Sequence, residues 1–306
     1  MQKDKTLDVH RRKYLDWPEE QAGQGDSCFP WLHQESNVCL DFHGDPSKAE
    51  LVVLSDGNHH MALQESLNAF SDMNGGVSIF YATTPPGPIV NMLRKGCIRM
   101  GNLRLSATPH VFISPPDILS PLVDEGLLSS SAPFMCNQGN VLLVEKGNPK
   151  GIASASDVLR EDVRLFISNP ETEKASYTAY RATLDNLLAS ACVDGVLQTK
   201  HAQGQLLYGE RIHHREAPQA VFEGQADAAM VFYHLALRYV RVFPDSFEMV
   251  PLGGSVHAPD PLPGNVVSKT NLGLVRDGGD WGRRLTTHLL SASVGDIYRR
   301  HGLIPA

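Results

Sequence analysis

The sequence predicts an α/β protein in which parallel strands alternate with helices. Short apolar segments recur along the chain, and many precede a segment whose apolar residues have helical spacing. In the first such unit, residues 51–54 are apolar, residues 55–58 are loop and helix-cap types, and the apolar residues after Met61 favour one side of a helix. Repeated alternation of this kind indicates parallel sheets with right-handed crossovers. The 306 residues, 42% of them hydrophobic, suffice for two domains or one large one.

The later elements follow the same rules in chain order. Apolar runs predict the strands, and apolar residues with helical spacing, ended by Gly or Pro, predict the helices. We expect strands at 77–81, 110–114, 140–145, 163–167, 228–232, 249–252 and 272–276, and helices at 89–95, 117–125, 154–159, 175–188, 218–223, 281–290 and 294–300.

Composition and charge exclude several classes of function. The net charge is −7 and no basic run is present, which argues against binding to nucleic acid or to an anionic membrane surface. The five cysteines include no C-x-x-C pair, so neither a thiolate zinc site nor a disulfide framework is expected. The motifs G-x-S-x-G, G-x-G-x-x-G and H-E-x-x-H and the P-loop are absent, and we expect no enzymatic activity.

The N-terminal residues carry no apolar segment of the secretory type, and no stretch is long enough to span a membrane. The chain is therefore cytoplasmic if the sequence is full length, or a leader has been removed. Residues 1–48 are polar but contain Tyr14, Trp17 and Trp31, and a disordered tail carries fewer aromatic residues. We interpret them as an extension that wraps the body of the protein.

The segments that follow the strands are the expected place of function, because ligands of open α/β sheets bind beyond the carboxyl ends of the strands. Ser55 and Asn58 follow the first strand, and Thr83 and Thr84 follow the second. Hydroxyls, amides and helix N-termini in such loops capture anions. Simple helix capping explains each loop equally well when it is taken alone.

Two histidine pairs, His59–His60 and His213–His214, lie in segments of this kind. One histidine from each pair could ligate a divalent metal ion, with Asp56, Glu216 or Tyr233 completing the shell. Adjacent residues on a helix point apart, so both members of a pair are not expected on one ion. Protonated histidines could attract an oxyanion instead. Chance pairing among 13 histidines, with solvated or capping roles, is the third interpretation.

The ordered set of segments resembles the type 2 solute-binding proteins of ABC transporters, in particular the molybdate- and tungstate-binding group. The likeness covers about residues 50–305. It rests on the first loop, on Thr83-Thr-Pro-Pro-Gly87, and on His110-Val-Phe-Ile-Ser-Pro-Pro-Asp117. It also rests on Asn137 to Pro149, Ile167 to Tyr177, Glu223-Gly-Gln-Ala-Asp-Ala-Ala-Met-Val231 and Gly295 to Pro305. Where some tungstate binders have an arginine before the second-lobe helix, this chain has Asn169-Pro170.

The resemblance implies a type 2 periplasmic-binding-protein-like fold, with two lobes that close around a ligand in the cleft between them. Lobe I would comprise residues 49–136 and 247–306, lobe II residues 137–246, and residues 1–48 would wrap lobe I. The implied ligand is a small molybdate- or tungstate-like oxyanion, with a divalent metal ion, a ligand-sensing role or an enzyme as alternatives. No cofactor is required, the partner would be a membrane ABC permease, and the protein would be a periplasmic monomer. Its contacts would be Ser55, Asn58, His59, Thr83, Thr84, Ala175, Ser176, Tyr177, His214 and Tyr233; the metal alternative uses His59, His60, His213 and His214.

Overall fold

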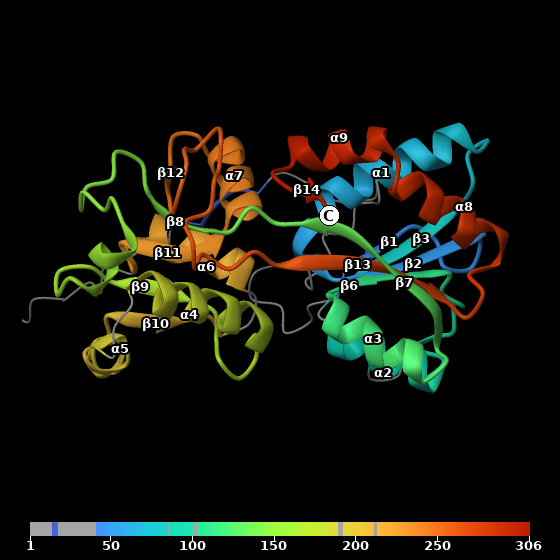
Figure 1. Ribbon diagram of the computed structural model, residues 1–306, viewed down its shortest axis with the longest axis horizontal. Helices are drawn as coiled ribbons and strands as arrows, with labels where there is room; N and C mark the ends of the chain where they lie inside the picture. Colours follow the sequence, from blue (N-terminus) through green and yellow to red (C-terminus); the bar gives the residue numbers. More distant parts are fainter. Residues whose placement is uncertain (1–13, 18–40, 85, 101–102, 189–191, 211–212) are drawn as a thin grey trace, which may run out of the picture.

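The computed structural model describes residues 14–17, 41–84, 86–100, 103–188, 192–210 and 213–306. They form two lobes, each built on its own sheet with helices on both faces (Figure 1). The mixed α/β fold and the two lobes predicted from the sequence are confirmed. Among the described helices, none has the length and the apolar character needed to cross a membrane.

The first lobe contains the larger sheet, of order β1-β3-β2-β6-β13-β7-β14. Strands β3, β2 and β6 are parallel, and β13 runs antiparallel to β6. Helices α1, α8 and α9 cover one face of this sheet and α2 and α3 the other (Figure 1), so its central strands are buried on both sides. The strands are β1 (Asp41–His43), β2 (Leu51–Ser55), β3 (Ile79–Thr83), β6 (Val111–Ser114), β7 (Leu128–Cys136), β13 (Lys269–Val275) and β14 (Ile304–Pro305). The helices are α1 (His60–Met73), α2 (Pro86–Lys95), α3 (Pro116–Asp124), α8 (Gly279–Leu289) and α9 (Ala292–Arg300).

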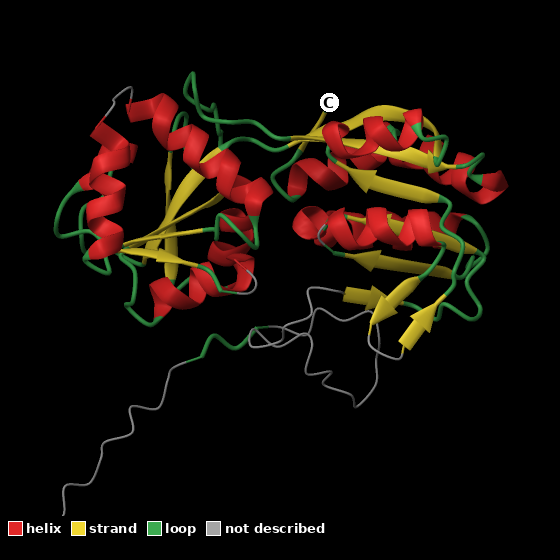
Figure 2. Cartoon of the chain, turned by 90° about the horizontal axis from the view of Figure 1, so that it is seen from below, coloured by secondary structure: helices red, strands yellow, loops and turns green. Residues whose placement is uncertain are grey.

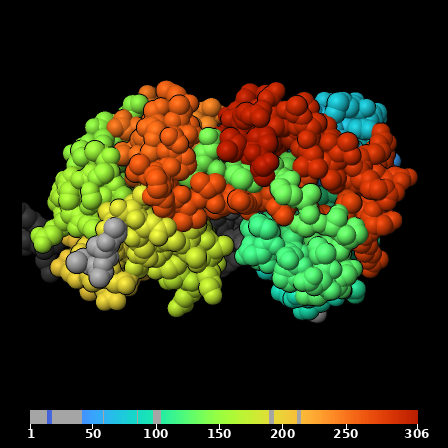
Figure 3. All heavy atoms as spheres, viewed as in Figure 1, coloured from blue at the N-terminus to red at the C-terminus, as the bar shows by residue number. Residues whose placement is uncertain are grey.

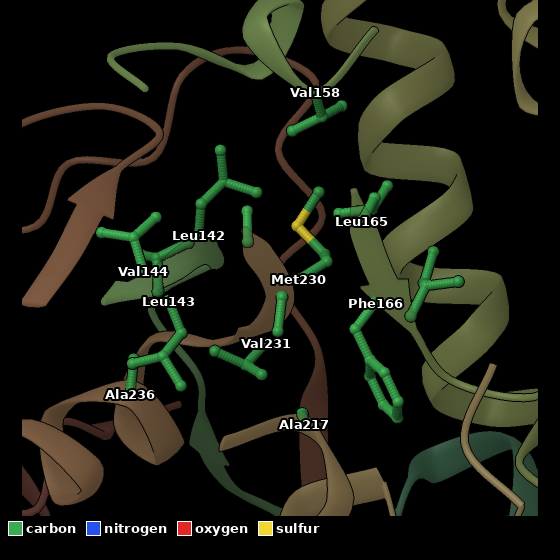
Figure 4. Packing of buried hydrophobic residues seen from close by; sticks show 14 of the residues in the cluster. Leu142, Leu143, Val144, Val158, Leu165, Phe166, Ala217, Met230, Val231 and Ala236 are labelled. Carbon is green, nitrogen blue, oxygen red and sulfur yellow. The ribbon is translucent and has the colours of Figure 1, made fainter. Parts of the chain in front are cut away.

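The second lobe contains a five-stranded sheet of order β10-β9-β11-β8-β12. Its core combines aliphatic and aromatic side chains, with Leu142, Met230 and Val231 packed from adjacent strands beside Phe166 (Figure 4). Figure 2 shows the helices of each lobe layered against the sheets. The strands are β8 (Asn140–Glu145), β9 (Leu165–Ile167), β10 (Leu206–Tyr208), β11 (Ala228–Phe232) and β12 (Phe247–Pro251), and the helices α4 (Lys174–Leu188), α5 (Cys192–Ala202), α6 (His213–Phe222) and α7 (Tyr233–Val242). Short elements are η2 (Gly57–His59), η3 (Ala155–Leu159) and the hairpin of β4 (Ile98–Met100) and β5 (Leu103–Leu105).

Residues 137–139 and 252–268 carry the chain between the lobes, and these two segments are bonded to each other. The Asn137 amide donates to the carbonyl of Ser268 at 2.9 Å. The Asn265 side chain accepts from the Asn140 amide at 2.8 Å and donates to the Asn140 carbonyl at 2.9 Å. The Asn265 side chain thus makes with the Asn140 backbone the two hydrogen bonds that a neighbouring strand would make. The two segments are therefore coupled where the lobes meet.

The structure differs from the predicted domain division at two places. The return to the first lobe was expected at residue 247. Instead, β12 pairs with β8 as an edge strand of the second sheet, so the chain leaves the second lobe only after residue 251. The N-terminal extension was expected on lobe I. Instead, Leu15 is buried in the core of the second lobe and Trp17 packs edge-on against Tyr239 and Phe243. Of the described residues of the extension, Asp41–His43 form β1, which joins the first sheet antiparallel to β3; residues 1–13 and 18–40 lie outside the described residues.

Candidate functional site

The carboxyl ends of three parallel strands bring a set of hydroxyl residues together in the first lobe. Ser55 is in register with Thr83 on one side and with Ile113 on the other. The Thr84 amide donates to the Ser55 carbonyl at 3.0 Å, which continues the pairing past the strand ends. Ser114 is the last residue of β6 and pairs with Asn271, two residues after β13 enters the first lobe. This edge of the sheet therefore faces the segments that link the lobes.

In the second lobe, too, the carboxyl ends of the parallel strands lie at the edge of the sheet next to the linking segments. Strands β9, β10 and β11 are parallel, and the last residue of β11, Phe232, pairs with Asn140. Asn140 is the first residue after the 137–139 segment. The carboxyl edges of the two sheets therefore face each other across the linking segments, and Figure 3 shows the surface hollowed between the lobes.

Three hydroxyls at the first-lobe edge are buried without a hydrogen bond. Thr83, Thr84 and Ser114 are 2%, 3% and 0% exposed, and none of their Oγ atoms has a partner among the described residues. Leaving a buried hydroxyl unsatisfied costs about 1–3 kcal/mol, so three in one place need an explanation. Sequence reasoning selected Thr83 and Thr84 but missed Ser114. Its signal was a serine that ends an apolar strand directly before Pro115 and Pro116.

Ser55 differs from these three because its hydroxyl is already bonded. Its Oγ donates to the Asp56 carbonyl at 2.9 Å and lies 3.0 Å from Nε2 of His59. The other ring nitrogen of His59, Nδ1, lies 3.0 Å from the hydroxyl of Tyr298 in α9. Ser55 and His59 are thus tied to the first lobe rather than free to reach into the cleft.

His59 is neutral near pH 7. Burial, and then the nearby His234 and His60, lower its pKa from 6.5 to about 3. This lowered pKa argues against the prediction that protonated His59 attracts an oxyanion, because a desolvated imidazole beside other histidines resists protonation.

The metal-binding alternative finds no donor set in the described part of the chain. Both ring nitrogens of His59 are engaged, and Nδ1 of His60 lies 3.1 Å from the Gly57 carbonyl. No group of three His, Cys, Asp or Glu residues is arranged to hold an ion there. The side chains of Asn58 and His213 lie outside the described residues. His213 and His214, predicted to lie in a segment after a strand, are instead the first residues of α6, where the His214 carbonyl accepts from the Tyr239 hydroxyl at 2.7 Å.

The predicted residues of the second lobe stand at the first turns of two helices. Ser176 Oγ accepts from Ser168 at 2.9 Å and donates to the Glu173 carbonyl at 3.1 Å. Ala175 beside it is exposed, and the Tyr177 ring packs edge-on against Tyr208. The first amides of a helix have no partner inside it, so the start of α4 offers N–H donors at this edge.

Tyr233 is the first residue of α7 and is almost fully buried. Its amide donates to the Gly139 carbonyl at 3.0 Å, and its hydroxyl donates to the Val256 carbonyl at 2.9 Å. The tyrosine is placed as predicted, at the end of β11, but its hydroxyl is committed to the protein.

A cavity of about 170 Å³ lies between the two lobes. Its walls come from the start of α1, with His59 and Met61, and from α7, with His234 and Leu235. The two helices whose N-termini follow β2 and β11 therefore face each other across open space.

The chain matches the family of bacterial extracellular solute-binding proteins over residues 51–304. No curated protein matches it significantly in sequence. Among solved structures, it is similar to the substrate-binding domain of a molybdenum ABC transporter from Clostridium difficile (15% identity, 84% of this chain and 98% of that one, TM-score 0.61). It is also similar to the periplasmic molybdate-binding protein of Azotobacter vinelandii (14%, 84% and 100%, TM-score 0.59). A tungstate-binding protein from Desulfovibrio alaskensis shares the fold at 9% identity (84% and 98%, TM-score 0.57). The two-lobe architecture and the match along 51–304 agree with these relatives: the chain belongs to the family of bacterial extracellular solute-binding proteins.

Proposed function

We propose that this protein binds a small tetrahedral oxyanion, molybdate or tungstate, between its lobes and delivers it unchanged to an ABC permease. The observation that carries the proposal is the set of three buried, unpartnered hydroxyls of Thr83, Thr84 and Ser114. An anion with oxygens in several directions would accept a hydrogen bond from each, and hydrogen bonds to a charged acceptor are the strong ones. The proposal places the protein outside the cytoplasm, facing its permease.

Recognition in this proposal depends on dipoles rather than on cationic side chains. His59 is neutral, and the three hydroxyls carry no charge. The first-turn amides of α4, near Ala175 and Ser176, would approach the anion from the opposite lobe, where the helix dipole favours negative charge. With a net charge of −7, the protein gains nothing from its overall field, so these local donors must supply the binding.

The known ligands of the similar structures support the same class of ligand. The relatives from Clostridium difficile, Azotobacter vinelandii and Desulfovibrio alaskensis are named for molybdenum, molybdate and tungstate. We propose the same ligands here because the hydroxyl set would suit them, and sulfate is the tetrahedral competitor to compare.

Isothermal titration calorimetry of the ligand-free protein tests the proposal, with molybdate, tungstate, sulfate and zinc as titrants. We expect tight binding of molybdate or tungstate and an affinity at least tenfold lower in Ser114→Ala. Thr287→Val, an exposed threonine on α8, is the control for loss of a hydroxyl elsewhere and should bind normally. No detectable binding of any of the three oxyanions, or an unchanged affinity in Ser114→Ala, would reject the proposed site.

A further inference from the structure

Both segments that link the lobes, together with one turn of the first lobe, meet at Tyr233. Its amide is bonded to Gly139 in the first linking segment, and its hydroxyl to Val256 in the second. The third segment is the turn after α9, which comes from the first lobe and packs on the first turns of α7.

The third contact is close because residue 302 is a glycine. A methyl group added to Gly302 would lie 3.1 Å from Cε1 of Tyr233, 3.0 Å from Cδ2 of Leu237 and 3.2 Å from Cα of His234. The Gly302 carbonyl also accepts from Nε2 of Gln138, at 3.1 Å, so this turn is bonded to the first linking segment as well. The tyrosine, the turn and residues 138–139 thus form one connected unit between the lobes.

We infer that Tyr233 is a positioning residue of the interlobe hinge, and that its packing against Gly302 sets the affinity for the oxyanion. This inference rests on the proposed function, but it assigns Tyr233 a different role from a ligand contact. A hydroxyl that is bonded to Val256 would have to break that bond to reach a ligand. As a positioning residue, Tyr233 holds the N-terminus of α7 against all three segments, so that the two carboxyl edges keep their alignment.

The test compares two glycine substitutions that strain the backbone equally. Gly302 has φ +81° and close neighbours across the lobes, whereas Gly126 has φ +71° and nothing within 4 Å of an added methyl group. Gly302→Ala and Gly126→Ala therefore share the cost of a left-handed alanine, and only Gly302→Ala pushes on Tyr233. We expect tungstate affinity to fall at least tenfold in Gly302→Ala and less than threefold in Gly126→Ala.

Hydrogen exchange of the ligand-free proteins gives a readout that needs no ligand. The Tyr233 amide, bonded to Gly139, should exchange at least tenfold faster in Gly302→Ala than in Gly126→Ala. An equal exchange rate in the two variants would overturn the inference, whether or not any oxyanion binds.

Tyr233→Phe separates positioning from direct contact. It removes the bond to Val256 but keeps the ring against Gly302, and we expect an affinity loss of about threefold. A loss above tenfold in Tyr233→Phe, with Gly302→Ala no worse than Gly126→Ala, would identify the hydroxyl as a ligand contact and overturn the inference.

Discussion

The two carboxyl edges that face each other across the lobes differ in how their hydroxyls are used. At the first-lobe edge, Thr83, Thr84 and Ser114 are buried and unbonded among the described residues. At the second-lobe edge, Ser168 donates to Ser176 and Tyr233 donates to Val256. The first lobe thus bears an energetic cost that a ligand could remove, while the hydroxyls of Ser168, Ser176 and Tyr233 in the second lobe are bonded without one. We infer that the first lobe supplies the side-chain contacts and that the second closes over them with backbone amides.

The largest effect should follow from removing the first-lobe hydroxyls. In a Thr83→Val, Ser114→Ala double variant, we expect tungstate affinity to fall at least 100-fold, about 2.7 kcal/mol. The ligand-free protein should keep its stability or gain some, because two unsatisfied buried hydroxyls, each costing about 1–3 kcal/mol, are gone. Calorimetry and urea unfolding measure the two quantities. A variant that loses stability and keeps its affinity would contradict the comparison.

Low pH should lower the free energy of unfolding of the first lobe, because two of its buried histidines resist protonation. The pKa values of His59 and His43 are lowered by burial to about 3 and about 4, from 6.5 in the unfolded chain. Between pH 4 and pH 6.5 the unfolded state binds more protons than the folded state. The free energy of unfolding is therefore highest above pH 6.5 and falls as the pH drops toward 4. At pH 5 the loss should be about 2 kcal/mol per histidine. Urea unfolding at pH 7.5 and pH 5 measures it, and a His59→Gln variant should show a shallower dependence.

Thr183, in the second lobe, has a buried hydroxyl that is hydrogen-bonded, whereas the hydroxyl of Ser114 is not. Thr183 Oγ1 accepts from Nδ2 of Asn140 at 2.6 Å and from the Val266 amide at 2.9 Å. Thr183→Val leaves the Val266 amide without this partner and Asn140 Nδ2 with only its 3.5 Å bond to the Val266 carbonyl, and we expect a loss of about 1–3 kcal/mol in the free energy of unfolding. If Thr183→Val proves as stable as the unmodified protein, the hydroxyls of the two lobes do not differ as proposed.

The sequence predicted strands best where the residues of a single strand form a continuous apolar run. Strands 140–145 and 228–232 have the predicted bounds, because uninterrupted apolar residues occur only where both faces of a sheet are covered. β7 was missed because Ser129 to Pro133 look like a loop; they form a strand only through pairing with β13. α7 was missed because it begins directly after β11, with no capping residue to mark its start.

The candidate site was predictable in its position but not in its chemistry. Ser55 and Thr83 end strands β2 and β3, Thr84 comes directly after β3, and strand ends can be located from the sequence. The lowered pKa of His59 depends on burial and on His234, which comes from the second lobe, and no local pattern contains that information. The commitment of Tyr233 to Val256 and Gly302 is likewise a property of the assembled lobes.

The smallest effect should come from Ser176, the second-lobe hydroxyl that the sequence selected as a ligand contact. Its Oγ already accepts from Ser168 and donates to the Glu173 carbonyl, so an anion would meet the amides of α4 and not this hydroxyl. In Ser176→Ala we expect tungstate affinity to change by less than threefold, about 0.6 kcal/mol. Calorimetry beside Ser114→Ala, the same replacement in the opposite lobe, measures the difference directly. If the two variants lose affinity equally, the hydroxyls of both lobes contact the ligand, and the division of roles between the lobes is wrong.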